Sequence, residues 1–586
     1  MKYFLATTAI SNFWDIKSDI LLLGPWCLTE ENSKKLIDYP SYSIVPSPWE
    51  SAGKIKDAAE YAQNIYKEIL PLLADKMNRL HGISRPNRYW QILLGPWLLH
   101  FIESLYERYS RINNTLRLFP NFYTNILPAE MRSLISWDTQ DFLSIRGKVN
   151  DDWYNLKLFS RIIDYLCPDK SVVVRPDNEM DDRRVVRRDR LTKRLFYGIK
   201  EIKNIFSRPN IILSDMHRIG CMQMLSLELK AGPNSICFKN FGNIRFGRGY
   251  AGYSETQREM LRFNERADAF QILLQRLIPC AIPMCFVENF KKYKESVNKE
   301  NVKIVGSAVG WHGNEKFKFY AAEAALRGAQ TVEFQHGGGY GMSLSVPTEF
   351  MALEKDVLYT WGWEPAADKK VKPLPSPYLS KLKNSAKSGS GKFLYIGVGT
   401  HRYLPIFCLQ LLSDDMHKYF NDKKIFFEAL TKNTQVKIEY CPYAEIGWSE
   451  VGTVRKLIPD IKFSRSGTLT DRMRKSDLVI IDHSSTTFIE ALTINVPCVL
   501  FWDHAVHGLR SEAEPYFDLL RKAGILHKTP QEAANKVEEI RKDPSAWWMD
   551  KETQELKDKF CEHFALTSKN WINIWKKELG QSNDNE

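Results

Sequence analysis

Two short polar segments, each following an apolar run, carry the residue types best suited to chemistry. The first is FQHGGGYG, residues 334–341, where an imidazole, three glycines and a phenol come after TVEF. Glycine permits positive φ and lets a ligand approach bare main chain, and His336 can donate a hydrogen bond or a proton to an anionic leaving group. We therefore expect His336, Gly337 and Gly338 to contact an anionic ligand. A plain strand-to-loop turn is the alternative.

The second segment is DLVIIDHSSTTFIEAL, residues 477–492, in which a buried strand ends at Asp482 and a helix soon begins. The free N–H groups of a first helical turn and the helix dipole attract an anion, and neighbouring hydroxyls can donate to phosphate oxygens. A helix whose Ser and Thr side chains only cap the backbone is the alternative. The candidate ligand-binding residues are His483, Ser484, Ser485 and Thr486, with Glu490 one turn later as an acceptor for ribose hydroxyls or a base.

Further polar residues follow other predicted strands of the same region. Gly306 and Ser307 come after KIV, and Tyr443 lies in EYCPYAEIGW. Because parallel sheets bind ligands at the carboxyl ends of their strands, we expect these residues to face the same crevice as the two segments above. The aromatic ring could stack on a nucleobase.

Two patterns resemble phosphate or metal sites without meeting their requirements. SGSGKF, residues 388–393, imitates the end of a P-loop, but it lacks the first glycine and has Phe393 where Ser or Thr would bind magnesium. His504 and His507 are spaced for a metal, but no third ligand stands out. We therefore expect no cofactor and no essential metal.

Carboxylates and arginines of the first half give weaker signals. Asp215 comes just after the strand-like run NIILS, and Asp152 precedes a predicted helix. Either could be catalytic, although carboxylates in such places more often cap helices or form salt bridges. Arg85 and Arg88 could pair with a substrate carboxylate, and structural salt bridges are the alternative.

The elements that must position these residues differ between the two halves of the chain. A length of 586 residues implies about two to four domains. Up to about residue 300 the pattern is helix-rich after two opening strands, whereas strands and helices alternate from residue 302, which predicts a doubly wound parallel sheet. We predict an N-terminal lobe at 1–300, a C-terminal lobe at 301–545 and a helical tail at 546–586, whose tryptophans would dock it on another domain.

The formal net charge of +12 suits an anionic partner such as a nucleotide, an acidic sugar or a phospholipid surface. The densest basic run, residues 181–194, mixes both signs and is typical of a solvated face. No stretch of about 18 apolar residues predicts a membrane span. The ten cysteines show no pairing pattern, which favours reduced thiols in a cytoplasmic protein.

Several segments together resemble a family of transferases from O-antigen and surface-polysaccharide loci, nearly end to end. The C-terminal half more distantly resembles the retaining β-Kdo glycosyltransferases, which use CMP-Kdo. This resemblance implies the GT-B arrangement of two Rossmann-like lobes with a cleft between them. It places the activated donor in the C-terminal lobe and the acceptor glycan on a helix-rich α/β N-terminal lobe. The segments are FLATTAISNFW, LLLGPWC, HG–RYWQILLGPWL, FQHGGGYG with YTWGW, and IDHSSTTFIEAL.

Carried onto this chain, the resemblance matches His336 with its glycines, and Ser484–Thr486, to the donor-nucleotide motifs. Asp215 is the position that we match to the carboxylate nucleophile. The expected reaction moves Kdo or a related acidic sugar from a CMP donor to a polysaccharide or lipopolysaccharide acceptor, without a metal, at the inner face of the membrane. The alternatives are a polyol-phosphate transferase using a CDP-alcohol and a non-catalytic protein that binds acidic polymer. Nucleic acid is not an expected partner.

Overall fold

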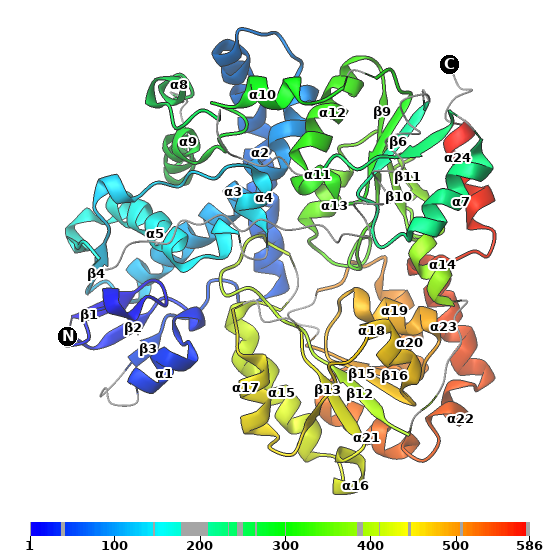
Figure 1. Ribbon diagram of the computed structural model, residues 1–586. Coiled ribbons are helices and arrows are strands. Elements are labelled where there is room, and N and C mark those ends of the chain that lie inside the picture. Colours follow the sequence, from blue (N-terminus) through cyan, green and yellow to red (C-terminus); the bar gives the residue numbers. More distant parts are fainter. Residues whose placement is uncertain are drawn as a thin grey trace.

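The computed structural model (Figure 1) describes the chain except for a set of short segments and one long one. The basic run 181–194 and the His504–His507 pair lie outside the described residues. The segments left out are 1, 37–41, 145–146, 177–208, 233, 243–249, 264–266, 299, 384–388, 390, 409–410, 444–446, 504–507 and 582–586.

The described strands form three sheets, and every strand pair in them is parallel. The first sheet has the order β3-β2-β1-β4-β5, so that the direction of winding reverses between β1 and β4. Its strands are β1 (Tyr3–Ala6), β2 (Ile20–Leu22), β3 (Tyr42–Ile44), β4 (Phe122–Ile126) and β5 (Ser171–Val173).

The middle sheet has the order β11-β10-β9-β8-β6-β7 and reverses between β6 and β8. A ligand crevice is expected where such an order reverses, outside the carboxyl ends of the strands. The strands are β6 (Ile211–Ser214), β7 (Ile236–Phe238), β8 (Ile304–Ser307), β9 (Gln330–Phe334), β10 (Val357–Thr360) and β11 (Val371–Pro373).

The third sheet has the order β14-β13-β12-β15-β16-β17 and reverses between β12 and β15. Its central strands are buried along their whole length, which is why they read as unbroken apolar runs such as LVII and CVLF. The strands are β12 (Phe393–Ile396), β13 (Ile438–Cys441), β14 (Lys462–Phe463), β15 (Leu478–Ile481), β16 (Cys498–Phe501) and β17 (Leu526–His527).

Two long helices, α2 (Ala52–His81) and α3 (Asn87–Leu118), lie between the first and middle sheets (Figure 1). The Ser51 side chain caps the start of α2 by accepting from the N–H of Lys54, and Gly82 ends the helix at φ 60°. α3 packs against both α2 and α12 (Glu315–Leu326), the helix between β8 and β9. The helix pair therefore joins the first sheet to the middle one.

The C-terminal helices leave the third sheet and return to the middle one. The last helix, α24 (Trp571–Gln581), lies beside α7 (Cys221–Ala231), as Figure 1 shows. The ring of Trp575 stacks on Phe334 at the end of β9, with the ring centroids 4.9 Å apart. As the sequence predicted, tryptophans of the tail dock it on another part of the chain.

The expected boundary at residue 300 is wrong, because the middle sheet crosses it. β6 and β7 precede residue 300, yet β6 pairs with β8, and the strands after residue 301 divide between two sheets. Local periodicity identifies a strand but carries no signal about which distant strand it will pair with. The middle and third sheets, each with its helices, form the two Rossmann-like lobes of the expected GT-B arrangement, which we call the middle lobe and the third lobe. The first sheet is a further α/β unit.

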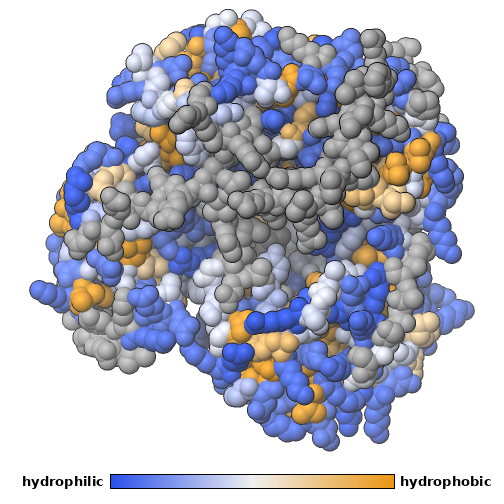
Figure 2. All heavy atoms as spheres, in the orientation of Figure 1, coloured by the Kyte–Doolittle hydropathy of each residue, from blue (hydrophilic) through white to orange (hydrophobic). Residues whose placement is uncertain are grey.

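Within the described ranges, none of the helices combines the length and the apolar character that crossing a membrane requires. On the face shown in Figure 2, hydrophobic side chains lie in small groups among hydrophilic ones.

Candidate active site

The two segments singled out in the sequence meet where the middle and third lobes touch. The N–H of Gly338, in the loop after β9, donates to Oγ1 of Thr486, the first residue of α19 (Thr486–Ile494), over 2.8 Å. A Cβ built on Gly338 would lie 3.2 Å from the main-chain N of Thr486. Glycine therefore permits the close approach of two chain segments here, which a side chain would crowd.

The start of α19 is capped by its own hydroxyls. Ser485 is the N-cap residue, and its Oγ accepts from the N–H of Thr487 at 3.5 Å. Ser485 and Thr486 are both partly exposed. The capping alternative is thus satisfied by Ser485, and the neighbouring Thr486 hydroxyl contacts the glycine loop of the other lobe.

His336 lies among other aromatic and imidazole rings. The Tyr340 hydroxyl is 3.2 Å from its Nδ1, and its ring centroid is 5.1 Å from that of His312 and 6.4 Å from that of His217. Burial, followed by the charges of His312 and His217, holds the pKa of His336 well below its ordinary value. The ring is therefore neutral at pH 7 and can donate one hydrogen bond.

Asp215 follows β6 at the point where the middle sheet reverses its order. Its φ of 44° is in the left-handed region, which Asp tolerates better than most residues. Its Oδ2 accepts from Asn314 Nδ2 at 2.7 Å and from Ser214 Oγ at 3.2 Å. The strand end and these two donors fix the carboxylate at the carboxyl edge of the sheet.

Glu490, expected to accept from a ribose or a base, is paired with a residue of the middle lobe. It forms an ion pair with Arg218, which also donates to the Tyr378 hydroxyl over 2.9 Å. Only 2% of Glu490 is exposed. Burial raises the pKa of Glu490, and the charge of Arg218 opposes this. In this arrangement the carboxylate is a second link between the lobes.

His483 supports the end of β15. It does not face the crevice, although the sequence predicted that it would. It is 3% exposed, and its Nδ1 lies 3.2 Å from Oδ1 of Asp482. Asp482 is also ion-paired with Lys423 and accepts from Tyr419 at 3.0 Å. Burial raises the pKa of Asp482, but Lys423 and His483 more than offset this and lower it to about 2.

Gly306 and Ser307, expected to face the ligand, are packing residues of the middle sheet. A Cβ on Gly306 would lie 2.5 Å from Val332 Cγ2 of the neighbouring strand. Ser307 is fully buried, and its Oγ accepts from the N–H of Gly310 at 2.8 Å. Their types are thus explained by strand packing and by the turn that follows β8.

Arg85 and Arg88 do not lie at the crevice either. Arg88 Nη2 is 2.6 Å from Asp356 Oδ2, and it donates to Thr331 at the start of β9, the amino end of the strand that delivers His336. Arg85 Nη2 is 3.7 Å from Glu323. The structural salt-bridge alternative therefore describes both arginines: Arg88 links α3 to the amino edge of the middle sheet, and Arg85 pairs with α12.

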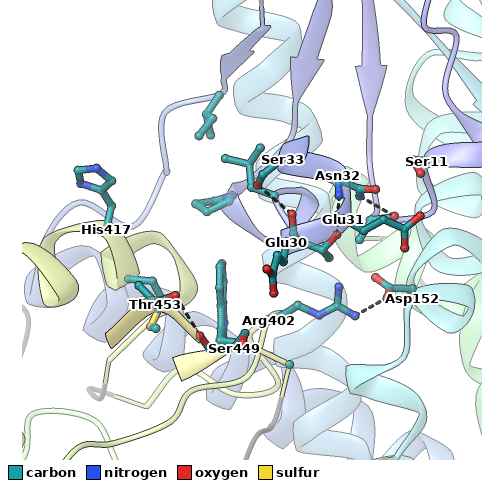
Figure 3. A pocket seen from close by; sticks show the side chains of 18 of the residues that line it. Ser11, Glu30, Glu31, Asn32, Ser33, Asp152, Arg402, His417, Ser449 and Thr453 are labelled. Atoms are coloured by element: carbon teal, nitrogen blue, oxygen red, sulfur yellow. Dashed lines mark hydrogen bonds and ion pairs between the residues drawn. The ribbon is translucent and has the colours of Figure 1, made fainter. Parts of the chain in front are cut away.

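A cavity of about 1240 Å³ lies between the carboxyl edge of the first sheet and the third lobe (Figure 3). Asp152, one of the expected catalytic carboxylates, lines this cavity instead of approaching His336. It is ion-paired with Arg402 and accepts from the Tyr403 hydroxyl. Other lining residues labelled in Figure 3 are Ser11, Glu30, Glu31, Asn32, Ser33, His417, Ser449 and Thr453.

Tyr443 follows β13 and therefore lies at the carboxyl edge of the third sheet. It is 45% exposed, and its N–H donates to Glu450 Oε2 at 2.8 Å. The ring is available to a ligand, as a stacking residue must be.

The sequence reasoning missed two residues beside His336. His312 belongs to α11 (Gly310–Gly313), and Glu333 is in β9; His312 Nε2 lies 3.1 Å from Glu333 Oε1. A signal was present, because a glutamate within the buried strand TVEF is unusual unless it has a partner.

The fold and the site define a two-lobed enzyme whose polar residues converge where two doubly wound sheets meet. A family model described as LIC12162 family transferase matches residues 3–579. The chain belongs to this family, and it is a transferase. None of the curated proteins compared with the sequence matches it.

Solved structures resemble the chain weakly. An α,α-trehalose 6-phosphate synthase of Burkholderia multivorans is 9% identical, with a TM-score of 0.35 over 64% of this chain and 97% of that one. MurG of Acinetobacter baumannii is 12% identical, with a TM-score of 0.32 over 64% of this chain and 100% of that one. Likenesses of this strength carry no argument about function, and the fold assignment rests on the sheets described above.

Proposed function

We propose that this transferase is a glycosyltransferase that moves a sugar from a nucleotide donor to a glycan acceptor. The observation that carries the proposal is the convergence of His336 and its glycine loop with the first turn of α19, each at the carboxyl edge of a doubly wound sheet. Such edges are where α/β proteins bind their ligands.

The donor phosphate would lie at the start of α19. The N–H groups of the first turn and the hydroxyls of Ser484, Ser485 and Thr486 suit an anion. The hydrogen bond between Gly338 and Thr486 would open on binding, so that the Gly338 N–H and the Thr486 hydroxyl could both turn to the phosphate. Neutral His336 would donate a further hydrogen bond from the facing lobe.

In the proposed reaction, the bond between the anomeric carbon and a phosphate oxygen breaks, and its electron pair stays on that oxygen. The donors around the phosphate stabilise the growing charge. Asp215 would attack the anomeric carbon to give a glycosyl ester. The acceptor hydroxyl oxygen then displaces the carboxylate, and its proton passes to solvent. Two displacements retain the anomeric configuration.

The acceptor would occupy the 1240 Å³ cavity beside the first sheet. That volume can hold several sugar units, and the lining mixes carboxylates, cations and the ring of Trp448. Such a mixture suits a polyhydroxylated ligand, which offers hydroxyls for hydrogen bonds and apolar ring faces for stacking. Asp152 and Arg402 would then be acceptor-binding residues.

The finer proposal is a CMP-activated acidic sugar such as Kdo, and a lipopolysaccharide or surface-polysaccharide acceptor. It is supported by the resemblance of FQHGGGYG and IDHSSTTFIEAL to the Kdo enzymes and by the net charge of +12. The same charge supports a peripheral contact with the inner face of the cytoplasmic membrane, where acidic phospholipids attract cations.

The test is to incubate the protein separately with CMP-Kdo and CDP-glycerol and to follow nucleotide release. Release of CMP with sugar, and no phosphate, on the acceptor supports the proposal, whereas consumption of CDP-glycerol supports polyol-phosphate transfer. Ser485→Ala and His336→Ala should each abolish turnover while leaving the fold intact, with a lower melting temperature expected for Ser485→Ala because Ser485 is the N-cap residue of α19. Full activity in both variants would falsify the site. A non-catalytic polymer-binding protein would instead bind acidic polymer in a salt-sensitive manner that Ser485→Ala does not change.

A further inference from the structure

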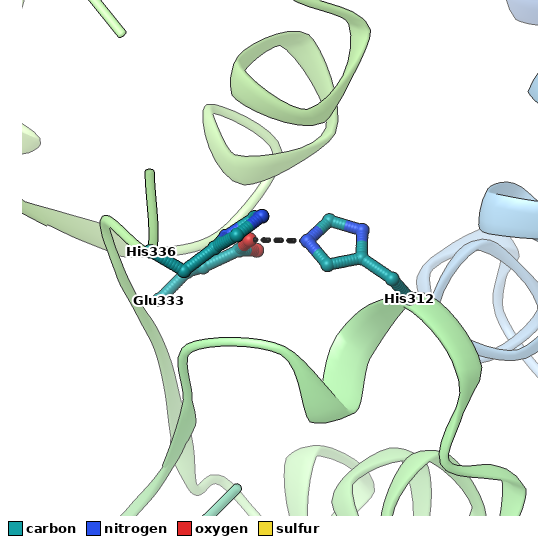
Figure 4. A group of neighbouring side chains, drawn as sticks. All are labelled: His312, Glu333 and His336. Carbon is teal, nitrogen blue, oxygen red and sulfur yellow. Dashed lines mark hydrogen bonds and ion pairs between the residues drawn. The ribbon is translucent and has the colours of Figure 1, made fainter. Parts of the chain in front are cut away.

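Three side chains that can bind metals converge next to the glycine loop. His312, Glu333 and His336 each offer one ligand atom, and these atoms lie within 4.8 Å of one another. Figure 4 shows the imidazole of His312 pointing toward the Glu333 carboxylate, which His336 overlaps in this view. His312 comes from α11, while Glu333 and His336 come from the end of β9 and the loop after it. Two different elements thus build the cluster.

The cluster has buried polar atoms without hydrogen-bond partners. Glu333 is 0% exposed, and its Oε2 has no hydrogen-bond partner; the nearest cation, Lys355 Nζ, is 3.7 Å away. Nδ1 of His312 also has none. Leaving a buried carboxylate oxygen unsatisfied is costly, so that each such atom in a native protein calls for an explanation.

We propose that His312, Glu333 and His336 bind one divalent transition-metal ion of the Zn²⁺ type. Two imidazoles and one carboxylate are a ligand set that zinc uses when a fourth position stays open. Mg²⁺ and Ca²⁺ prefer all-oxygen sites and fit this set poorly.

The distances are compatible with this assignment. His312 Nε2 and Glu333 Oε1 are 3.1 Å apart. Ligand atoms on one tetrahedral zinc, each about 2.0–2.1 Å from the metal, are about 3.3 Å apart. The three ligand atoms lie within 4.8 Å of one another, so the wider pairs must close by up to roughly 1.5 Å to reach this spacing.

The charges indicate what fills the open position. One carboxylate does not neutralise a divalent ion, and Lys355 adds a further positive charge nearby. The site therefore calls for an anion, and the proposed donor phosphate would lie beside Gly338, two residues after His336. This last step rests on the proposed function. It implies that metal and CMP each raise the affinity of the other by the same factor.

The experiment is a cobalt titration of the full chain after metal removal by a chelator. Co²⁺ reports ligand geometry through its visible d–d absorption, and Zn²⁺ should then displace it. We expect one equivalent to bind. Glu333→Gln and His312→Ala should lower the affinity by more than the roughly 10–100-fold typical of losing an outer-shell partner. His563→Ala is the matched control, because His563 stacks on Tyr516 far from the cluster in sequence and contacts none of its residues described here.

Two further variants keep the test decisive if a ligand variant folds poorly. His312→Cys should bind Co²⁺ through its thiolate and give a thiolate-to-metal charge-transfer band. No such band is expected if residue 312 has only a structural role. Lys355→Met should strengthen metal binding by removing a nearby positive charge. If Co²⁺ binds without saturating at one equivalent, or equally well to Glu333→Gln and the unaltered chain, the cluster is only an ion-paired network and the inference is overturned.

The outcome separates this inference from the proposed function. Cobalt binding is measured without nucleotide, and CMP binding is measured calorimetrically on metal-free protein. CMP binding without a metal site would remove only the metal inference. If the metal site is confirmed but CMP binds neither the metal-free nor the metal-loaded protein, the proposed function is removed and the metal inference stands.

Discussion

The main-chain N–H of Gly338 donates to Thr486 Oγ1 over 2.8 Å, which joins the loop after β9 to the first turn of α19. One residue comes from the middle lobe and the other from the third lobe. The ion pair between Arg218 and Glu490 makes a second link between the lobes, and Glu490 lies in α19 as Thr486 does. The lobes therefore touch through the same residues that are proposed to hold the donor, and binding and lobe contact must compete.

Substitution of Gly338 by alanine should separate the lobes. The added Cβ would lie 3.1 Å from Ile489 Cδ1 and 3.2 Å from the Thr486 nitrogen. Overpacking of this kind costs about 1–3 kcal/mol, so we expect a lower melting temperature in calorimetry. Gly337→Ala is the matched control, because its Cβ would meet only Thr486 Oγ1 at 3.5 Å. Equal melting temperatures for the two variants would contradict this account of the contact.

Replacement of Asp215 by asparagine should stop turnover and leave CMP binding intact. The amide keeps the shape of the carboxylate, which is held by Asn314 and Ser214, but it is a poor nucleophile. The kcat for sugar transfer and the dissociation constant for CMP are the two measurements. Transfer at the unaltered rate would show that another group attacks the anomeric carbon.

Loss of Lys423 should strongly destabilise the third lobe. Lys423 and Asp482 are both fully buried and ion-paired. Removing one partner of such a pair typically costs about 3–5 kcal/mol, so Lys423→Met should lower the free energy of unfolding in urea by about this amount. Lys424→Met changes the neighbouring residue, which is 49% exposed and pairs with Glu428 at 3.7 Å; a loss of similar size there would remove the explanation.

Acid should also weaken the lobe: the pKa of Asp482 is lowered to about 2, so its contribution is present above the ordinary value of 3.8 and is lost as pH falls through 2.

Glu103 of α3 should make the protein less stable at alkaline pH. Burial raises the pKa of Glu103 from 4.5 to about 8. The folded state then binds more protons than the unfolded state, so the stabilisation is complete below pH 4.5 and falls as pH rises through about 8. Between pH 6 and pH 9, which lie on either side of about 8, the melting temperature of Glu103→Gln should therefore fall by less than that of the unaltered chain. Glu60→Gln, on the exposed part of α2, should behave like the unaltered chain.

The sequence predicted the strands of the later half well because buried parallel strands are unbroken apolar runs. It also predicted that FQHGGGYG and IDHSSTTFIEAL come together, but it placed both in one domain, whereas β9 belongs to the middle sheet and β15 to the third. It missed β3, β7 and β17, which have only three, three and two residues, and also β4 and β11. It could not place Arg88, because the partner Asp356 is 268 positions away. His312 was missed for the same reason, since its role depends on Glu333, 21 positions later.

The stacking of Trp575 on Phe334 has a consequence for how the protein is made. Phe334 ends the strand that presents His336, and its ring is covered by a residue more than two hundred positions further on. A ribosome must therefore translate as far as Trp575 before the ring of Phe334 acquires its stacking partner. The packing of the middle lobe is therefore completed only after the third lobe has been synthesised, although the strands of the middle sheet come first in the chain.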